Sequence, residues 1–173
     1  MTTRRMLVLG AAAAPWLGRR AAAQSAAPPN EPLRIGWLAA LTGPSSAPAV
    51  GFNRGVMFAA DELNAAGGVL GRKVEIITRD TQGDPTKAVN ATQELISRAK
   101  VHAIWGPTNS GEALATTPIM ARAKMPCVHP CVVDSLIDPV RFPNAFRMAP
   151  SNGQWDDAVR AYVLNTLEVR DVA

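Results

Sequence analysis

The chain has 173 residues, of which 18 are lysine or arginine and 14 are aspartate or glutamate. Four of the arginines lie in residues 1–23, so the rest of the chain carries 14 basic and 14 acidic residues and has no net charge. About 150 residues are enough for one domain with a hydrophobic core. Their neutral balance gives no support for a nucleic-acid partner or for binding to a charged membrane surface.

The first 23 residues are typical of an export signal. A basic start, Met1–Arg5, precedes the apolar, alanine-rich run Met6–Gly18, and Ala21–Ala23 offers the small residues that signal peptidase accepts. The apolar run is shorter than the about 20 residues that span a bilayer. An arginine pair in the basic start leaves both the twin-arginine route and the general secretory (Sec) route open. We expect residues 1–23 to be a signal peptide and residues 24–32 to be a flexible leader.

Strands and helices are predicted to alternate along the rest of the chain, because short apolar runs alternate with segments of helical periodicity. Strands are expected at residues 33–38, 74–78, 101–105, 126–129 and 145–148, with the first residues of a further strand at 169–173. Helices are expected at residues 50–65, 85–100, 112–123 and 153–166. Asp84 is expected to cap the second helix, with Pro85 in its first turn.

This alternation predicts an α/β fold with a doubly wound parallel sheet that helices cover on both faces. Ligands of such sheets bind beyond the carboxyl ends of the strands. That rule selects three loops as the candidate site, at residues 41–49, 106–111 and 130–135.

The loop at residues 106–111 is the strongest candidate, because it joins the end of a strand to the start of a helix. Backbone N–H groups in the first turn of a helix have no partners within it, and the helix dipole adds positive charge there. Asn109, Ser110 and Gly111 could therefore bind a carboxylate without a lysine or an arginine, with the Ser110 hydroxyl as a further donor. Ser110 could also serve as the helix N-cap, alone or together with that role.

The two other loops offer further candidates. Ser45 and Ser46 could hydrogen-bond a ligand or cap the helix that follows them. Cys131 and Val133 follow the fourth strand, where they could contact a ligand or simply pack beneath the loop.

The ordered set of these features resembles the amino-terminal lobe of the periplasmic solute-binding proteins that serve ABC transporters, in the leucine/isoleucine/valine-binding family. The resemblance rests on the strand Leu33–Leu38, the loop Leu41–Ala47, the helix end and strand start in Asp61–Val74, and Asp84-Pro85 after the second strand. It implies one lobe of a type I periplasmic binding fold at residues 33–173, truncated at its C-terminus. Proteins of this kind have two lobes that close around a small ligand.

The same resemblance implies a function. It predicts a periplasmic substrate-binding component of an ABC importer, which captures an amino acid or a related small carboxylate or amide and meets a permease in the inner membrane. It implies neither an enzyme nor a cofactor. A ligand-sensing domain of a receptor or regulator is the alternative, and a secreted hydrolase is a less favoured one. Because half a cleft leaves a ligand exposed to water, the chain alone is expected to bind weakly.

The resemblance also implies roles for single residues. Ser110 matches the serine that binds the α-carboxylate of an amino acid. Cys131 and Val133 match positions that touch the carboxylate and the ammonium group, and Val133 replaces a threonine, so it offers no hydroxyl. Better-known members of the family have a disulfide, and the two positions that match its cysteines are Gly83 and Asn109 in this chain, so that bridge is absent.

Other chemistry fits the sequence poorly. Cys127, His129 and Cys131 have poor spacing for zinc and lack a fourth ligand, and an extended chain places the two cysteines too far apart for a disulfide. A Ser110–His129 pair would resemble nucleophilic catalysis, but Gly-x-Ser-x-Gly fails because Glu112 stands where a glycine should be. We therefore assign no catalytic residue, metal site or nucleotide-binding motif.

Overall fold

The computed structural model describes residues 31–169. The expected signal peptide, the leader up to residue 30, and residues 170–173 of the last expected strand lie outside the described residues. The strands are β1 (Leu33–Ala39), β2 (Val74–Asp80), β3 (Ala103–Trp105), β4 (Cys127–His129) and β5 (Ala145–Arg147). The helices are α1 (Ser46–Ala65), α2 (Pro85–Ser97), α3 (Ser110–Arg122) and α4 (Asn152–Asn165), with a 3₁₀ turn at Asp134–Leu136.

The five strands form one parallel sheet in the order β2-β1-β3-β4-β5. β1 and β2 pair over their whole length, from Leu33 opposite Val74 to Ala39 opposite Asp80. This order confirms the predicted doubly wound α/β fold. β5 confirms the short strand expected near residue 145, whereas Val169, expected to begin a further strand, is not in a strand.

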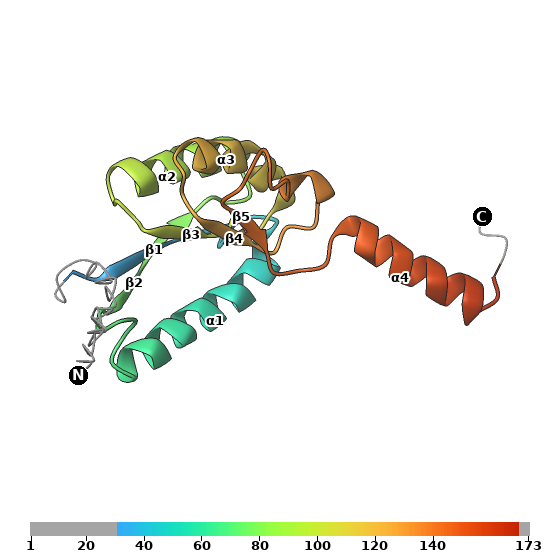
Figure 1. Cartoon of the computed structure of the whole chain (residues 1–173), viewed down its shortest axis with the longest axis horizontal. Coiled ribbons are helices and arrows are strands. Elements are labelled where there is room, and N and C mark those ends of the chain that lie inside the picture. Colours follow the sequence, from blue (N-terminus) through green and yellow to red (C-terminus); the bar gives the residue numbers. More distant parts are fainter. Residues whose placement is uncertain (1–30, 170–173) are drawn as a thin grey trace, which may run out of the picture.

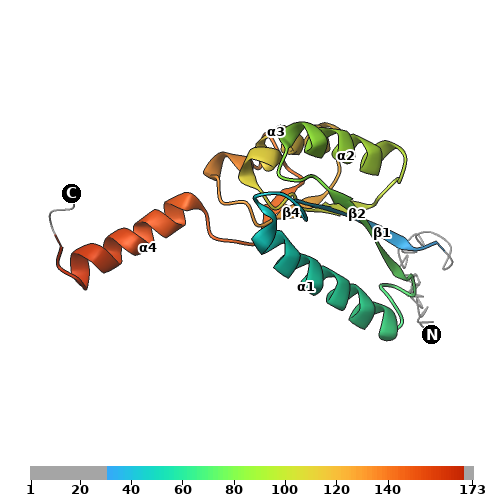
Figure 2. The same ribbon diagram turned by 180° about the vertical axis from the view of Figure 1, so that it is seen from behind.

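Helices α2 and α3 lie side by side on one face of the sheet, and α1 lies on the other (Figures 1 and 2). Under α1, the fully buried ring of Trp37 meets Trp105 edge-on, with ring centroids 4.3 Å apart. A larger core cluster is formed by the buried residues Leu38, Leu95, Val101, Ile104, Met120, Cys127, Phe142 and Ala145. Two clusters therefore fix the sheet between the helices and hold the carboxyl ends of its strands at one edge.

Several helix boundaries differ from the prediction. α1 begins at Ser46 and not at residue 50, because Pro48 falls in the first turn, where its missing N–H removes no helix hydrogen bond. α2 begins as predicted: the Asp84 carboxylate accepts hydrogen bonds from the N–H groups of Thr86 (2.7 Å) and Lys87 (3.0 Å). The last expected helix is confirmed as α4.

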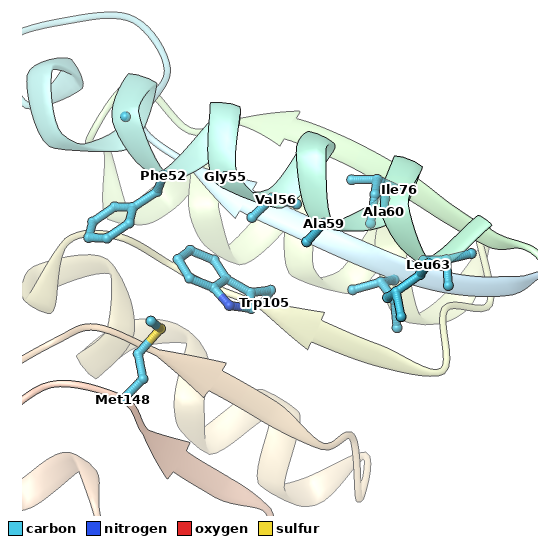
Figure 3. Close-up of a pocket in the computed structure, with 12 residues that line it drawn as sticks. Phe52, Gly55, Val56, Ala59, Ala60, Leu63, Ile76, Trp105 and Met148 are labelled. Atoms are coloured by element: carbon cyan, nitrogen blue, oxygen red, sulfur yellow. The ribbon is translucent and has the colours of Figure 1, made fainter. Parts of the chain in front are cut away.

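Helices lie on both faces of the sheet, as predicted, but α1 covers its face only in part. Trp105, Val128 and Phe146 lie side by side across β3, β4 and β5, and Phe146 is 55% exposed. A groove of about 420 Å³ runs between α1 and the sheet (Figure 3). Its lining is apolar and includes Phe52, Gly55, Val56, Ala59, Leu63, Ile76 and Met148.

α4 extends away from the sheet, and none of its side chains is buried (Figures 1 and 2). Local signals form it: the Ser151 hydroxyl accepts a hydrogen bond from the N–H of Gln154 (3.2 Å), whose side chain accepts one from the N–H of Ser151 (2.8 Å). Its exposed face carries Trp155 and Tyr162. Among the helices of residues 31–169, none combines the length and the apolar character that crossing a bilayer requires.

Candidate ligand-binding site

The three loops predicted to form the site meet at the carboxyl ends of the strands. The side-chain amide of Asn109 donates a hydrogen bond to the Ser45 hydroxyl (3.4 Å), which joins the first loop to the second. The Cys131 thiol donates to the carbonyl oxygen of Pro107 (3.2 Å), which joins the third loop to the second. Residues far apart in the sequence therefore form one continuous rim.

Asp80, the last residue of β2, anchors the first loop. Its carboxylate accepts hydrogen bonds from the N–H of Leu41 (2.9 Å), the hydroxyl of Thr42 (2.6 Å) and the N–H of Gln82 (3.0 Å). Partial burial favours the neutral acid, but these hydrogen bonds outweigh it and lower the pKa of Asp80. Asp80 is therefore a charged anchor of the rim at neutral pH.

The start of α3 differs from the prediction by one residue. Asn109 is the N-cap, and its side-chain oxygen accepts a hydrogen bond from the N–H of Gly111 at 2.8 Å. The suggestion that Ser110 is the cap is therefore wrong. Ser110 is half-buried with its hydroxyl beside the Cys131 thiol, and Gly111 is exposed.

Ser45 and Ser46 are half-buried at the start of α1. Ser45 occupies the N-cap position, but its side chain makes no capping hydrogen bond, so its predicted role as a cap is wrong. Its hydroxyl instead faces Asn109 and Gly83. Ser46 is the first residue of the helix, and its N–H donates to the carbonyl oxygen of Gly43 (3.2 Å).

Cys131 and Val133 lie beneath the third loop. Cys131 is buried in a cluster with Ala113 and Leu136, and burial raises the pKa of its thiol to about 12. Val133 packs against the same cluster, and its carbonyl oxygen accepts a hydrogen bond from the Arg147 guanidinium (3.2 Å). Both side chains therefore serve packing, which was one of the two readings left open by the sequence.

His129 is fully buried at the end of β4, and neither ring nitrogen has a hydrogen-bond partner among residues 31–169. Burial, with a smaller effect of the Arg147 charge, lowers the pKa of His129 to about 4. Because its ring nitrogens have no partner, His129 makes no hydrogen bond to the Ser110 hydroxyl, which the hydrolase alternative would need.

Cys127 and Cys131 are free thiols in two separate clusters, and the described part of the chain contains no cluster of three metal-ligating side chains.

One buried acid at the site was not identified from the sequence as part of it. Glu112 lies in the first turn of α3 and is fully buried. Acidic residues are common in the first turn of exposed helices, so the residue type gave no signal of burial. The sequence offered one indication that Glu112 belongs to the candidate site, namely its position two residues after Ser110.

The groove beneath α1 is a separate feature from this rim. None of the predicted site residues lines it, and its lining offers almost no polar side chain that could orient a solute (Figure 3). Ligand sites combine apolar walls with a few placed polar groups. The rim at the carboxyl ends of the strands meets that description better.

Comparison with known proteins gives consistent matches. A profile of the family described as "Periplasmic binding protein" matches residues 32–173. The Leu/Ile/Val-binding protein BraC3 of Rhizobium johnstonii is 28% identical over 141 residues, which cover 82% of this chain and 38% of that protein. The chain therefore spans well under half the length of this relative.

Solved structures show the same relationship. The branched-chain amino acid transporter substrate-binding protein LivJ from Streptococcus pneumoniae, in complex with isoleucine, matches with a TM-score of 0.74 and 26% identity. The match covers 80% of this chain and 39% of that one. An ABC transporter substrate-binding protein from Sphaerobacter thermophilus matches with a TM-score of 0.69 and 36% identity, over 81% of this chain and 38% of that one.

Proposed function

The chain belongs to the periplasmic binding protein family, in its leucine/isoleucine/valine-binding branch, and we propose that residues 33–173 form the amino-terminal lobe of the substrate-binding component of an ABC importer. The ligand is a small solute, an amino acid or a related carboxylate or amide. It is captured between this lobe and a second lobe. The partner is a permease in the inner membrane, which the protein meets in the periplasm after export directed by residues 1–23.

The observation that carries this proposal is the meeting of three loops beside the start of α3. The Ser110 hydroxyl and the first-turn amides of that helix suit a carboxylate, because the helix dipole favours an anion there. The residues proposed to contact the ligand are Ser45, Ser46, Asn109, Ser110 and Gly111, and Cys131 and Val133 are proposed to contact it through the backbone of their loop.

The residues of this lobe support the binding of a carboxylate better than the binding of an ammonium group. An ammonium group needs oxygen acceptors, and the carbonyl oxygen of Val133 already accepts from Arg147. The side chain of Val133 offers no oxygen. A small carboxylate, an amide or an amino acid whose ammonium group binds the second lobe therefore fits this rim.

An NMR titration of the ¹⁵N-labelled chain tests the proposal, because it detects the weak binding expected of one lobe. Isoleucine, benzoate, acetamide and urea are the probes. We expect isoleucine or benzoate to shift the amide signals of Ser110 and Gly111 in a saturable way. Ser110→Ala should weaken the binding, whereas Ser97→Ala, at the far end of α2, should leave it unchanged.

Two outcomes would count against this function. One is the absence of any saturable shift at Ser110 and Gly111 with all four probes. The other is binding that Ser110→Ala and Ser97→Ala leave equally intact, since the ligand would then lie elsewhere. A longer form of the protein with both lobes should bind the same probe more tightly, because a closed cleft removes more of its surface from water.

A further inference from the structure

The carboxyl group of Glu112 is in an unusual place for an acid. Its side chain is fully buried, and neither carboxyl oxygen has a hydrogen-bond partner among residues 31–169. The dipole of α3 favours a negative charge in its first turn. However, burying an ionised carboxylate without hydrogen-bond partners costs far more than burying the neutral acid.

The groups that act on Glu112 lie on several neighbouring parts of the chain. The charged neighbours that act on it are Asp80 from the end of β2 and Asp84 from the cap of α2, and the Cys131 thiol lies on the third loop. Hydrogen bonds lower the pKa of both aspartates, although partial burial opposes this, so both are ionised at neutral pH.

The net effect on Glu112 is a shift toward the neutral acid. Burial is the largest cause and raises the pKa of Glu112 above its ordinary value, and the charges of Asp80 and Asp84 act in the same direction. The nearby Thr81 hydroxyl and Asn109 N–H oppose this shift but do not cancel it. The Thr81 hydroxyl likewise has no hydrogen-bond partner within bonding distance in the described part of the chain.

We propose that Glu112 makes the capture of a carboxylate at Ser110 and Gly111 depend on a proton. In its neutral form the acid allows the first turn of α3 to hold an anion. In its ionised form it adds a third negative charge to those of Asp80 and Asp84, in the helix turn that holds the anion. Glu112 is thus a positioning and selectivity residue that does not itself touch the ligand, and this role rests on the function proposed above.

Linkage gives the sign of the effect. An anion bound at Ser110 makes ionisation of Glu112 less favourable, so binding is accompanied by proton uptake, and the two effects are reciprocal. Affinity for a carboxylate should therefore be highest at low pH and fall as the pH rises through the ionisation of Glu112. Each unit by which the anion raises the pKa corresponds to about a tenfold change in affinity.

The test compares Glu112→Gln with Glu62→Gln, which makes the same chemical change on the exposed side of α1. Isoleucine is titrated from about pH 5 to about pH 8, where its carboxylate stays ionised. The Ser110 and Gly111 amide signals give the affinity. As the pH rises through the ionisation of Glu112, we expect the affinity of the unmodified chain and of Glu62→Gln for isoleucine to fall about tenfold or more. The affinity of Glu112→Gln should stay the same throughout.

A second measurement does not depend on the variant folding. The carboxyl carbon of Glu112, labelled with ¹³C, is titrated in the unmodified chain with and without isoleucine. Support requires a pKa above the ordinary glutamate value that rises further with isoleucine. A pKa at or below that value, no change with isoleucine, or equal pH dependence in Glu112→Gln overturns the coupling alone. A lack of saturable binding in every variant at every pH overturns the proposed function and the coupling with it.

Discussion

The side-chain oxygen of Asn109 accepts a hydrogen bond from the N–H of Gly111 at 2.8 Å. One of the two amides assigned to the ligand is therefore already paired within the chain. A carboxylate that reaches Gly111 has to compete with Asn109, whereas one that binds through the Ser110 hydroxyl does not. This contact makes Asn109 both a helix cap and a competitor for the proposed ligand.

Replacing Asn109 with alanine separates these two roles. We expect Asn109→Ala to lower the free energy of unfolding by about 1 kcal/mol, because α3 loses its N-cap. The same change frees the Gly111 N–H, which should offset the loss of the proposed Asn109 contact, so the affinity for isoleucine should rise or stay level while stability falls. Urea denaturation and the NMR titration measure the two quantities.

Asn90→Ala is the matched control for that experiment. Asn90 is exposed within α2, so alanine should leave stability unchanged or raise it slightly, in line with helix propensity. Equal stability of Asn109→Ala and Asn90→Ala would show that the 2.8 Å contact does not cap α3 in solution.

His129 should make the stability of the lobe depend on pH. Burial lowers the pKa of His129 from 6.5 to about 4. Its contribution to stability is therefore complete above pH 6.5 and is lost as the pH falls through about 4, because the unfolded chain binds the proton more readily. The full loss is roughly 3 kcal/mol, from the conversion of pKa shifts to free energy.

The measurement is urea denaturation of the unmodified chain and of His129→Gln between about pH 7 and pH 4. The variant should be less stable at neutral pH but lose less stability on acidification. His102→Gln changes the exposed histidine and should retain the acid sensitivity. If His129→Gln and the unmodified chain lose stability in parallel, the buried ring is not the source of the effect.

The elements that could be predicted are those with strong local signals. Asp84-Pro85 carries a cap residue followed by a proline in the first turn, so the start of α2 was located correctly. At α3, Asn109 and Ser110 are both good caps, and the choice between them depends on backbone geometry that the sequence does not express. The three candidate loops could be predicted to lie together because parallel strands all end at one edge of the sheet.

The rest depends on contacts between distant residues. The environment of Glu112 includes the charges of Asp80 and Asp84 and the Cys131 thiol of the third loop, which meet α3 only in the folded chain. The packing of Val133 follows from the 3₁₀ turn at Asp134–Leu136, which has no strong sequence signal. The partial cover of the α1 face reflects the absence of a second helix beside α1 within residues 31–169.

Gly106 should be among the least replaceable residues of the site. Its backbone has a φ of +105°, and a Cβ atom there would lie 2.0 Å from the carbonyl oxygen of Leu38. Gly106→Ala therefore has to move β1 or β3, both of which carry loops of the rim. We expect the free energy of unfolding, measured by urea denaturation, to fall by on the order of 4 kcal/mol or more, as for other changes that force the backbone to move.

Gly71→Ala isolates the steric part of that loss. Gly71 also has a left-handed backbone, with a φ of +76°, but a Cβ atom there would meet nothing within 4 Å. Gly71→Ala should therefore lower the free energy of unfolding only by the conformational penalty of about 1–2 kcal/mol. Similar losses for the two variants would contradict the close approach of Gly106 to Leu38.

Gly55→Ala should raise the stability of the chain. Gly55 lies in the middle of α1, and a Cβ atom there would meet nothing within 4 Å, because it borders the open groove shown in Figure 3. A helix is more stable with alanine than with glycine in its middle by about 0.5–1 kcal/mol, and no clash offsets this gain. The free energy of unfolding, measured by urea denaturation, should increase by this amount.

Gly36→Ala provides the contrast in the same sheet. A Cβ atom on Gly36 would lie 3.0 Å from a methyl carbon of Leu95, inside the core, so this variant should lose stability. If Gly55→Ala also lowers stability, the groove is filled in solution, because some other part of the protein then occupies the space where the new methyl group points. Opposite signs for the two variants establish that the flank of α1 is open while the α2 side of the sheet is closely packed.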